Sequence, residues 1–202
     1  VEGFYFMVMA TKGNVATSDS YKTMTYHEVF HIYQMSNVFT DNYDEVDSKM
    51  GRMSGDNSEE LVAWWMEGNA DFFGALYSRD AEGFKSEMRC ALECTGPFSV
   101  SRKDKFFDEG LKLRNISWDQ GDLVDLGYRL GSWFVAYLTS VHGEGALYDF
   151  WETVDEMDFE ATFLRQFGVD YRTYLDEFEV WLRNPNENLL AILDDIYANK
   201  AR

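Results

Sequence analysis

Apolar residues recur at helical spacing over most of this chain, separated by polar or turn-forming stretches. The pattern predicts helices over residues 58–78, 81–94, 123–141, 146–154, 159–167, 171–182 and 187–197. Caps at Ser18, Asp19 or Ser20 predict one more helix, which continues to about Val38. Residues 40–58 and 95–104 are polar and contain glycine or proline, so we expect loops there.

One short segment departs from the helical pattern. Residues 4–10 (FYFMVMA) form an apolar run before the turn sequence TKGN, which predicts a β-strand. We therefore expect an α+β fold that is mainly α, with a small N-terminal β element and a C-terminal helical lobe. A loose boundary between Pro97 and Trp118 divides the chain into residues 1–110 and residues 111–202, two parts of one unit.

The length and composition fit a folded protein. The chain has 202 residues, of which 46% are hydrophobic and 17% aromatic, enough for one sizeable domain or two small lobes. No apolar run approaches the ~18 residues of a membrane-spanning helix. The sequence opens in an apolar stretch without a signal segment, so we expect a piece of something longer.

The charge is strongly acidic. The chain has 36 acidic and 18 basic residues, a formal net charge of −18. Such a surface repels nucleic acid and anionic membranes, so neither is expected as a partner. The composition is typical of secreted or salt-adapted proteins and favours an extracytoplasmic location. A solvated acidic surface with no specific partner is the simpler interpretation.

Two of the three histidines flank a glutamate in the sequence HEVFH, which contains His27, Glu28 and His31. Residues four apart share one face of a helix, so both imidazoles can reach one ion. Glu28 is then close enough to act on a water bound beside them, as in the HExxH zinc motif. The alternative is two unrelated histidines on one helix.

A catalytic zinc ion usually has three protein ligands, so a third ligand is required. Glu67, in WWMEGNADFF, is the leading candidate, and Asp71 can accept a hydrogen bond from the outer ring nitrogen of His27. Glu60 and His142 are competing candidates. The neighbouring tryptophans and phenylalanines indicate a core position for Glu67 and Asp71 rather than a solvated acidic stripe.

The two motifs together resemble the gluzincin metallopeptidases, the thermolysin and aminopeptidase N-like group. These proteins carry HExxH on one helix and a ligand glutamate on the next, often within W-x-x-E-G-x-A. The matching residues here are Trp64, Glu67, Gly68 and Ala70. An aspartate four residues after the glutamate supports the first histidine in that family, and Asp71 stands at this position.

The resemblance implies a zincin-like catalytic fold with one Zn²⁺ per chain. The implied ligands are His27, His31 and Glu67. Glu28 is the implied general base. The segment YRLGSWFVAYL is similar to the Y-x-x-G helix of aminopeptidase N-like enzymes, which implies that Tyr128 stabilises the oxyanion and that Gly131 is the motif glycine.

The implied function is a zinc-dependent metallopeptidase, a hydrolase that cleaves a peptide or protein substrate through a zinc-activated water. No G-x-M-E-N motif is present, so recognition of a free amino terminus is not supported. Two alternatives stay open: a catalytically silent gluzincin-like binding module, and a zinc hydrolase with a non-peptide substrate. The intact Glu28 argues against the silent module, since a structural site needs no base.

Three smaller features complete the prediction. Gln34, one heptad after His27, either lines the site or supports helix contacts. The segment DNYDEVD offers carboxylates that can bind Ca²⁺, although its spacing is not that of an EF-hand and a solvated loop is the simpler interpretation. Cys90 and Cys94 can form a local disulfide or remain two free thiols.

Overall fold

The computed structural model describes residues 18–57 and 59–200, and these residues are mainly helical, as predicted. The α-helices are α1 (Asp19–Ser36), α2 (Tyr43–Lys49), α3 (Met66–Ser78), α4 (Ala81–Glu93), α5 (Arg102–Asp108), α6 (Val124–His142), α7 (Gly145–Thr153), α8 (Phe159–Phe167), α9 (Tyr171–Leu182), α10 (Asn186–Leu190) and α11 (Ile192–Asn199). Short 3-10 helices are η2 (Leu113–Asn115), η3 (Gly121–Leu123) and η4 (Val154–Glu156).

The predicted strand at residues 4–10 lies outside the described residues. Within residues 18–57 and 59–200, extended pairing consists of two isolated bridges, Met53 with Leu61 and Val62 with Ser117. These bridges explain why the helix predicted over residues 58–78 begins only at Met66. Backbone pairing with distant segments holds residues 61 and 62 extended, although their side chains follow a helical pattern.

The loops predicted over residues 40–58 and 95–104 were partly wrong, because the first contains a short helix and the second contains the start of one. Residues 40–58 include α2, and residues 95–104 include the start of α5. Each helix has a side-chain N-cap: Asn42 accepts a hydrogen bond from the amide of Asp44, and Ser101 accepts one from Asp104. Such caps stabilise a helix start by about 1 kcal/mol, which matters most in helices this short.

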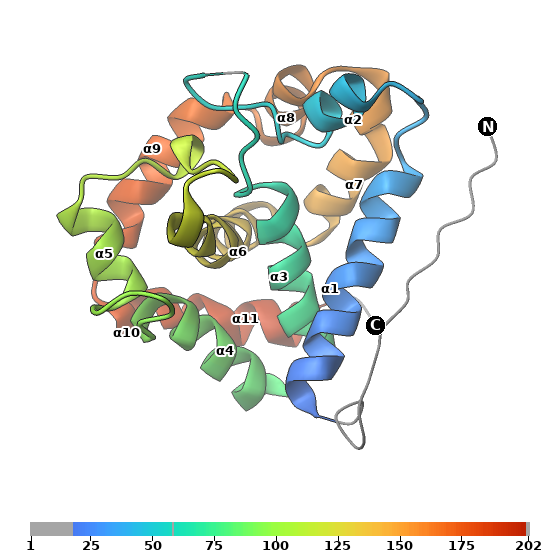
Figure 1. Ribbon diagram of the computed structural model, residues 1–202. Helices are drawn as coiled ribbons and strands as arrows, with labels where there is room; N and C mark the ends of the chain where they lie inside the picture. The colour runs from blue at the N-terminus through green and yellow to red at the C-terminus, as the bar shows by residue number, and fades with distance from the viewer. Residues whose placement is uncertain (1–17, 58, 201–202) are drawn as a thin grey trace.

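Helix α6 lies in the centre of the molecule, seen nearly end-on in Figure 1, with α3 beside it and α1 on the far side of α3. Trp64 and Trp65, just before α3, are fully buried. Trp65 stacks on Trp151, with ring centroids 5.9 Å apart, and Trp64 packs edge-on against Phe134. The core therefore includes side chains from both predicted parts of the chain.

Glycines allow the three central helices to touch. A Cβ atom on Gly68 of α3 would lie 2.5 Å from the carbonyl carbon of Gly131 in α6, so only glycine fits there. On another face of α3, a Cβ atom on Gly74 would lie 3.2 Å from the backbone nitrogen of His27 in α1. These approaches bring polar side chains of α1, α3 and α6 within reach of one another.

Two further predictions concern covalent and membrane features. Cys90 of α4 and Cys94, its C-cap, form a disulfide, with Cα atoms 4.7 Å apart. Of the two alternatives left open by the sequence, the structure therefore has the local disulfide. Among the described helices, none combines the length and the apolar character that crossing a bilayer requires.

Candidate metal centre

Helix α1 presents both histidines on one face. Its start is capped by Ser18, whose hydroxyl oxygen accepts a hydrogen bond from the amide of Tyr21 at 3.3 Å. One helical turn separates His27 from His31, and their Nε2 atoms lie 3.0 Å apart. The two ring planes are nearly perpendicular. The short distance between the Nε2 atoms allows both of them to contact one ion.

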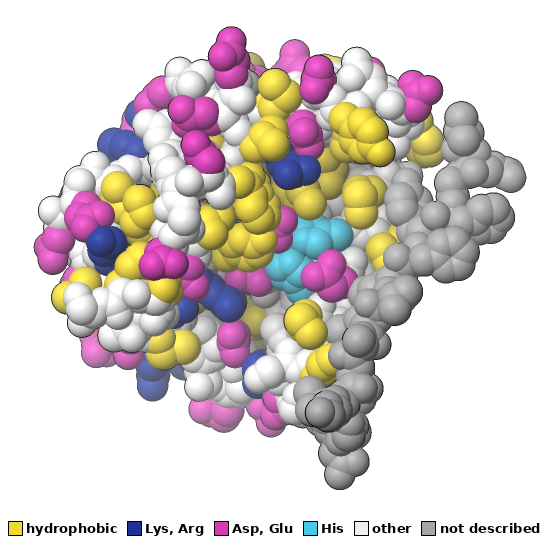
Figure 2. Space-filling model, in the orientation of Figure 1, with side chains coloured by type: hydrophobic (Ala, Val, Ile, Leu, Met, Phe, Trp, Pro, Cys, Tyr) yellow, Lys and Arg dark blue, Asp and Glu magenta, His cyan; other side chains and the backbone are white. Residues whose placement is uncertain are grey.

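Glu67, in the first turn of α3, completes a triangle. Its Oε2 atom lies 3.1 Å from Nε2 of His31 and 3.2 Å from Nε2 of His27. The side chains of the three residues are 6–12% exposed, so the group is largely shielded from water. Histidine side chains reach the surface beside acidic and hydrophobic groups on the face shown in Figure 2.

The triangle fits a transition-metal ion. Ligands about 2.0–2.2 Å from a tetrahedral zinc ion lie about 3.3–3.6 Å from one another. The three separations here, 3.0, 3.1 and 3.2 Å, are slightly shorter. Two imidazole nitrogens and one carboxylate oxygen are a common ligand set of catalytic zinc sites. In the described part of the chain, these residues are the one group of three or more metal-binding side chains whose ligand atoms converge within 4.8 Å.

Each imidazole also has a partner on its outer nitrogen. Nδ1 of His27 lies 2.9 Å from a carboxylate oxygen of Asp71. Nδ1 of His31 lies 2.7 Å from the amide oxygen of Gln34. Contacts of this kind orient metal-binding histidines and keep the inner nitrogen free for the ion. The sequence predicted Asp71 as the partner of His27, and for Gln34 it left open whether the side chain lines the site or supports helix contacts.

Arg129 of α6 extends this network behind His27. Its guanidinium donates to the second carboxylate oxygen of Asp71 at 3.0 Å and lies 3.8 Å from Glu87. Asp71 thus bridges an imidazole and a guanidinium. Sequence reasoning missed Arg129, although a charged residue directly after Tyr128 in an apolar helix was a usable signal.

Neighbouring groups shift the pKa values of His27 and Glu67. Burial lowers the pKa of His27, but hydrogen bonds to Asp71 and Glu67 and their negative charges outweigh it and raise that pKa to about 9. Burial raises the pKa of Glu67, whereas its hydrogen bonds to the two histidines and their charges lower it to about 2. Without a metal, the site therefore favours a protonated His27 beside an ionised Glu67.

Glu28 and Tyr128 flank the triangle. Glu28 follows His27 on α1 and is half-buried. The ring of Tyr128 lies parallel to that of His27, with centroids 6.2 Å apart. Burial raises the pKa of Tyr128, and the charge of Glu67, a hydrogen bond to it and the charge of Glu28 raise it further. The phenol therefore keeps its proton at neutral pH and can donate it in a hydrogen bond.

The structure does not bring the two competing ligand candidates to the triangle. Glu60 is exposed and accepts a hydrogen bond from the side chain of Asn57 at 2.9 Å. His142 lies at the C-terminal end of α6, where its Nε2 is 2.7 Å from the hydroxyl of Tyr174. Burial lowers the pKa of His142, and none of the convergent ligand atoms belongs to it.

The acidic segment considered for Ca²⁺ has other partners. Its residues form α2 and the turn before it. Asp47 pairs with Arg52 at 2.8 Å, and Glu45 accepts a hydrogen bond from the hydroxyl of Thr40 at 2.8 Å. These contacts tie two of the four carboxylates to the local fold, and the segment supplies no convergent group of metal ligands among the described residues.

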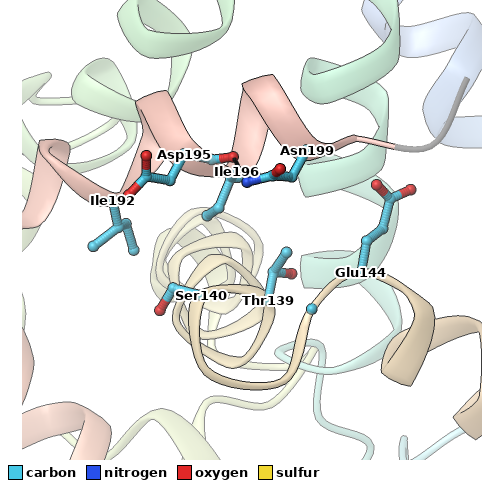
Figure 3. Close-up of a pocket in the computed structure, with 8 residues that line it drawn as sticks. Thr139, Ser140, Glu144, Ile192, Asp195, Ile196 and Asn199 are labelled. Carbon is cyan, nitrogen blue, oxygen red and sulfur yellow. Dashed lines mark hydrogen bonds between the residues drawn. The ribbon is translucent and has the colours of Figure 1, made fainter.

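A separate cavity of about 460 Å³ lies between the C-terminal end of α6 and α11 (Figure 3). Its lining includes Thr139, Glu144, Ile192 and Asn199. None of the predicted site residues lines it. The triangle combines convergent ligand atoms with shifted pKa values, two features that often occur together at functional sites.

Comparison of the chain with protein-family models, with curated proteins and with solved structures finds no match.

Proposed function

We propose that this chain is a zinc-dependent metallopeptidase with a zincin-like catalytic arrangement. The proposal rests on one observation above all. The inner nitrogens of His27 and His31 and one oxygen of Glu67 converge within 3.2 Å of one another in a largely buried site. The HEVFH and WWMEGNADFF motifs, which resemble those of the gluzincins, supply these same residues.

His27, His31 and Glu67 would hold the ion. A zinc ion at such a site supplies Lewis acidity, which lowers the pKa of a bound water towards about 7 and polarises a carbonyl group. Asp71 and Gln34 keep the two imidazole rings in position through their outer nitrogens. The ring orientations in the protein therefore match those that ligation needs.

Glu28 would act as the general base. Its carboxylate follows the first ligand histidine directly and belongs to none of the metal-binding contacts, so it is available to accept a proton from the attacking water. The same carboxyl group can return that proton to the amine that leaves. Because Glu28 would act first as the base and then as the acid, the mechanism requires no second acid on the described helices.

Tyr128 would stabilise the negative charge that develops on the carbonyl oxygen during attack. Its hydroxyl carries a proton at neutral pH, as an ordinary tyrosine does, and burial and nearby carboxylates raise its pKa further. The hydrogen bond from this neutral donor becomes stronger as negative charge develops on the carbonyl oxygen, so its contribution is greatest in the transition state. Gly131, one turn later, lets this part of α6 approach α3.

The decisive experiment compares Glu28→Gln with Glu60→Gln on a library of internally quenched peptides. The zinc-loaded wild type should cleave a subset of peptides, and chelation should stop cleavage. Glu28→Gln should keep one zinc per chain and lose at least about 100-fold in rate, because it removes the base and leaves the ligands. Glu60→Gln should match the wild type in both respects.

Other outcomes separate the alternatives. Zinc binding with no cleavage of any peptide, and no difference caused by Glu28→Gln, would favour the silent binding module. Zinc-dependent hydrolysis of ester or other non-peptide substrates alone would favour the non-peptide hydrolase. Failure to bind zinc after reconstitution would remove the basis of the proposal.

A further inference from the structure

Gln34 is the most completely buried polar side chain that contacts the candidate metal ligands. It lies one turn after His31 on α1 and has an exposed fraction of 0%. Its amide has two partners: Nδ1 of His31 at 2.7 Å, and the backbone carbonyl of Met66 at 3.1 Å. Met66 begins α3 and directly precedes Glu67, so Gln34 contacts one proposed ligand directly and the helix that carries another.

The chemistry of these partners determines the direction of both hydrogen bonds. The carbonyl of Met66 can only accept, so the NH₂ group of Gln34 must face it. The amide oxygen then faces Nδ1 of His31, which must carry the proton. The flipped amide would place two oxygens against each other, an arrangement that leaves both buried groups without a donor.

A proton on Nδ1 leaves Nε2 as the ring nitrogen that can bind the ion, in place of its contact with Glu67. That atom faces the Glu67 carboxylate and His27 in the metal triangle. We propose that Gln34 is a positioning residue that accepts the Nδ1 proton of His31 and so reserves Nε2 of that ring for the ion. The inference rests on the proposed metal site for its purpose, although the tautomer itself can be measured without a metal.

The same side chain also joins the two ligand-bearing helices. Its donor group holds the carbonyl at the start of α3, and its acceptor group holds the ring of His31 on α1. A shift of α3 along α1 would therefore weaken a contact to the ring as well as move Glu67. Gln34 therefore couples the orientation of the His31 ring to the position of Glu67.

The test reads the tautomer directly. Long-range ¹H–¹⁵N correlation spectra of the imidazole rings distinguish Nδ1–H from Nε2–H, and the chain has only three histidines to assign. The spectra are recorded on the metal-free protein. The wild type should show a proton on Nδ1 of His31, whereas an Nδ1 without a proton would overturn the proposal.

Variants then separate positioning from packing. Gln34→Met removes the acceptor while keeping the volume, and should shift His31 towards Nε2–H and weaken zinc binding about 10- to 100-fold. Gln34→Glu keeps an acceptor for the ring and should retain the Nδ1–H tautomer. An unchanged tautomer in folded Gln34→Met would show that the contact only fills space and would overturn the proposal.

Asn69→Leu provides the matched control. Asn69 is also a fully buried amide, but its partners are the carbonyl of Trp65 and the indole of Trp151. The control should lose stability without changing the His31 tautomer. If the wild type has the expected tautomer but binds no zinc, the proposed function fails while the assignment of Gln34 stands. If Gln34→Met does not fold, the wild-type spectrum remains the deciding result.

Discussion

Gly68 of α3 and Gly131 of α6 face each other so closely that a Cβ atom on Gly68 would lie 2.5 Å from the carbonyl carbon of Gly131. A Cβ atom on Gly131 would itself fall against the carbonyl oxygen of Trp64. The contact is backbone against backbone, so no side-chain rotation can relieve it. This approach brings Tyr128, one turn before Gly131, beside the helix that carries Glu67.

Gly131→Ala should therefore destabilise the protein by about 3 kcal/mol, because the two backbones must separate to admit a methyl group. Urea unfolding followed by circular dichroism measures the change. Gly145→Ala is the control, since a Cβ atom there meets nothing within 4 Å. It should change stability by less than about 1 kcal/mol. Equal stability in both variants would contradict the close approach.

Glu67→Ala should remove most bound zinc, whereas Glu60→Ala should leave about one zinc per chain. Glu67 supplies one of three convergent ligand atoms, and Glu60 is exposed and bonded to Asn57. Metal analysis after dialysis against a weak chelator gives the stoichiometry of both variants. The reverse order of zinc loss would move the third ligand to Glu60.

Tyr128→Phe should lower kcat about 100-fold and leave the zinc content unchanged, because it removes one donor to the transition state. Steady-state kinetics on a cleaved peptide, together with metal analysis, measures both effects. Tyr33→Phe is a matched control on α1, where the hydroxyl bonds weakly to the carbonyl of Tyr148 at 3.4 Å. A kcat unaffected by Tyr128→Phe would assign charge stabilisation to another donor.

Zinc binding should release about one proton between pH 6.5 and pH 9. In this range His27 is protonated in the metal-free protein, because its pKa is raised to about 9. The ion must displace that proton, so the apparent affinity should fall about tenfold for each pH unit below 9. Calorimetry in two buffers of different ionisation enthalpy counts the protons. Asp71→Asn should reduce the release, since it removes a charge that raises this pKa.

The same shift affects the stability of the metal-free protein. A histidine whose pKa is 6.5 in the unfolded chain and about 9 in the folded chain stabilises the fold fully below pH 6.5. This contribution, on the order of 3 kcal/mol, should disappear as the pH rises through 9. Chemical unfolding of the metal-free protein from pH 6 to pH 10 tests the direction. Stability that rises over this range would contradict the protonation of His27.

Local sequence rules predicted which side chains of the candidate site share a helix face. The spacing of His27 and His31 acts within one helix, where residues four apart share a face. The same rule relates Glu67 to Asp71 within α3. Apolar periodicity also indicated most of the helices, because each buries one face in the core. These features depend on neighbours in the sequence, so the sequence alone contains them.

Features that depend on helix packing were not predictable in this way. Arg129 reaches Asp71 only because α6 lies against α3, and Gln34 reaches the carbonyl of Met66 only because α1 does. Tertiary pairing likewise overrode the helical pattern of residues 58–65, where Val62 bridges to Ser117. Propensity is a weak preference, and long-range backbone pairing outweighs it at these positions.

The proposed ligands His31 and Glu67 are 36 residues apart in the chain, on helices that pack side by side. An ion held by both would act as a removable cross-link between α1 and α3. Free zinc at 100 times its dissociation constant would add about 2.7 kcal/mol to the free energy of unfolding. Resistance to proteolysis would then rise and fall with the zinc concentration around the protein, so that metal supply would control its lifetime as well as its chemistry.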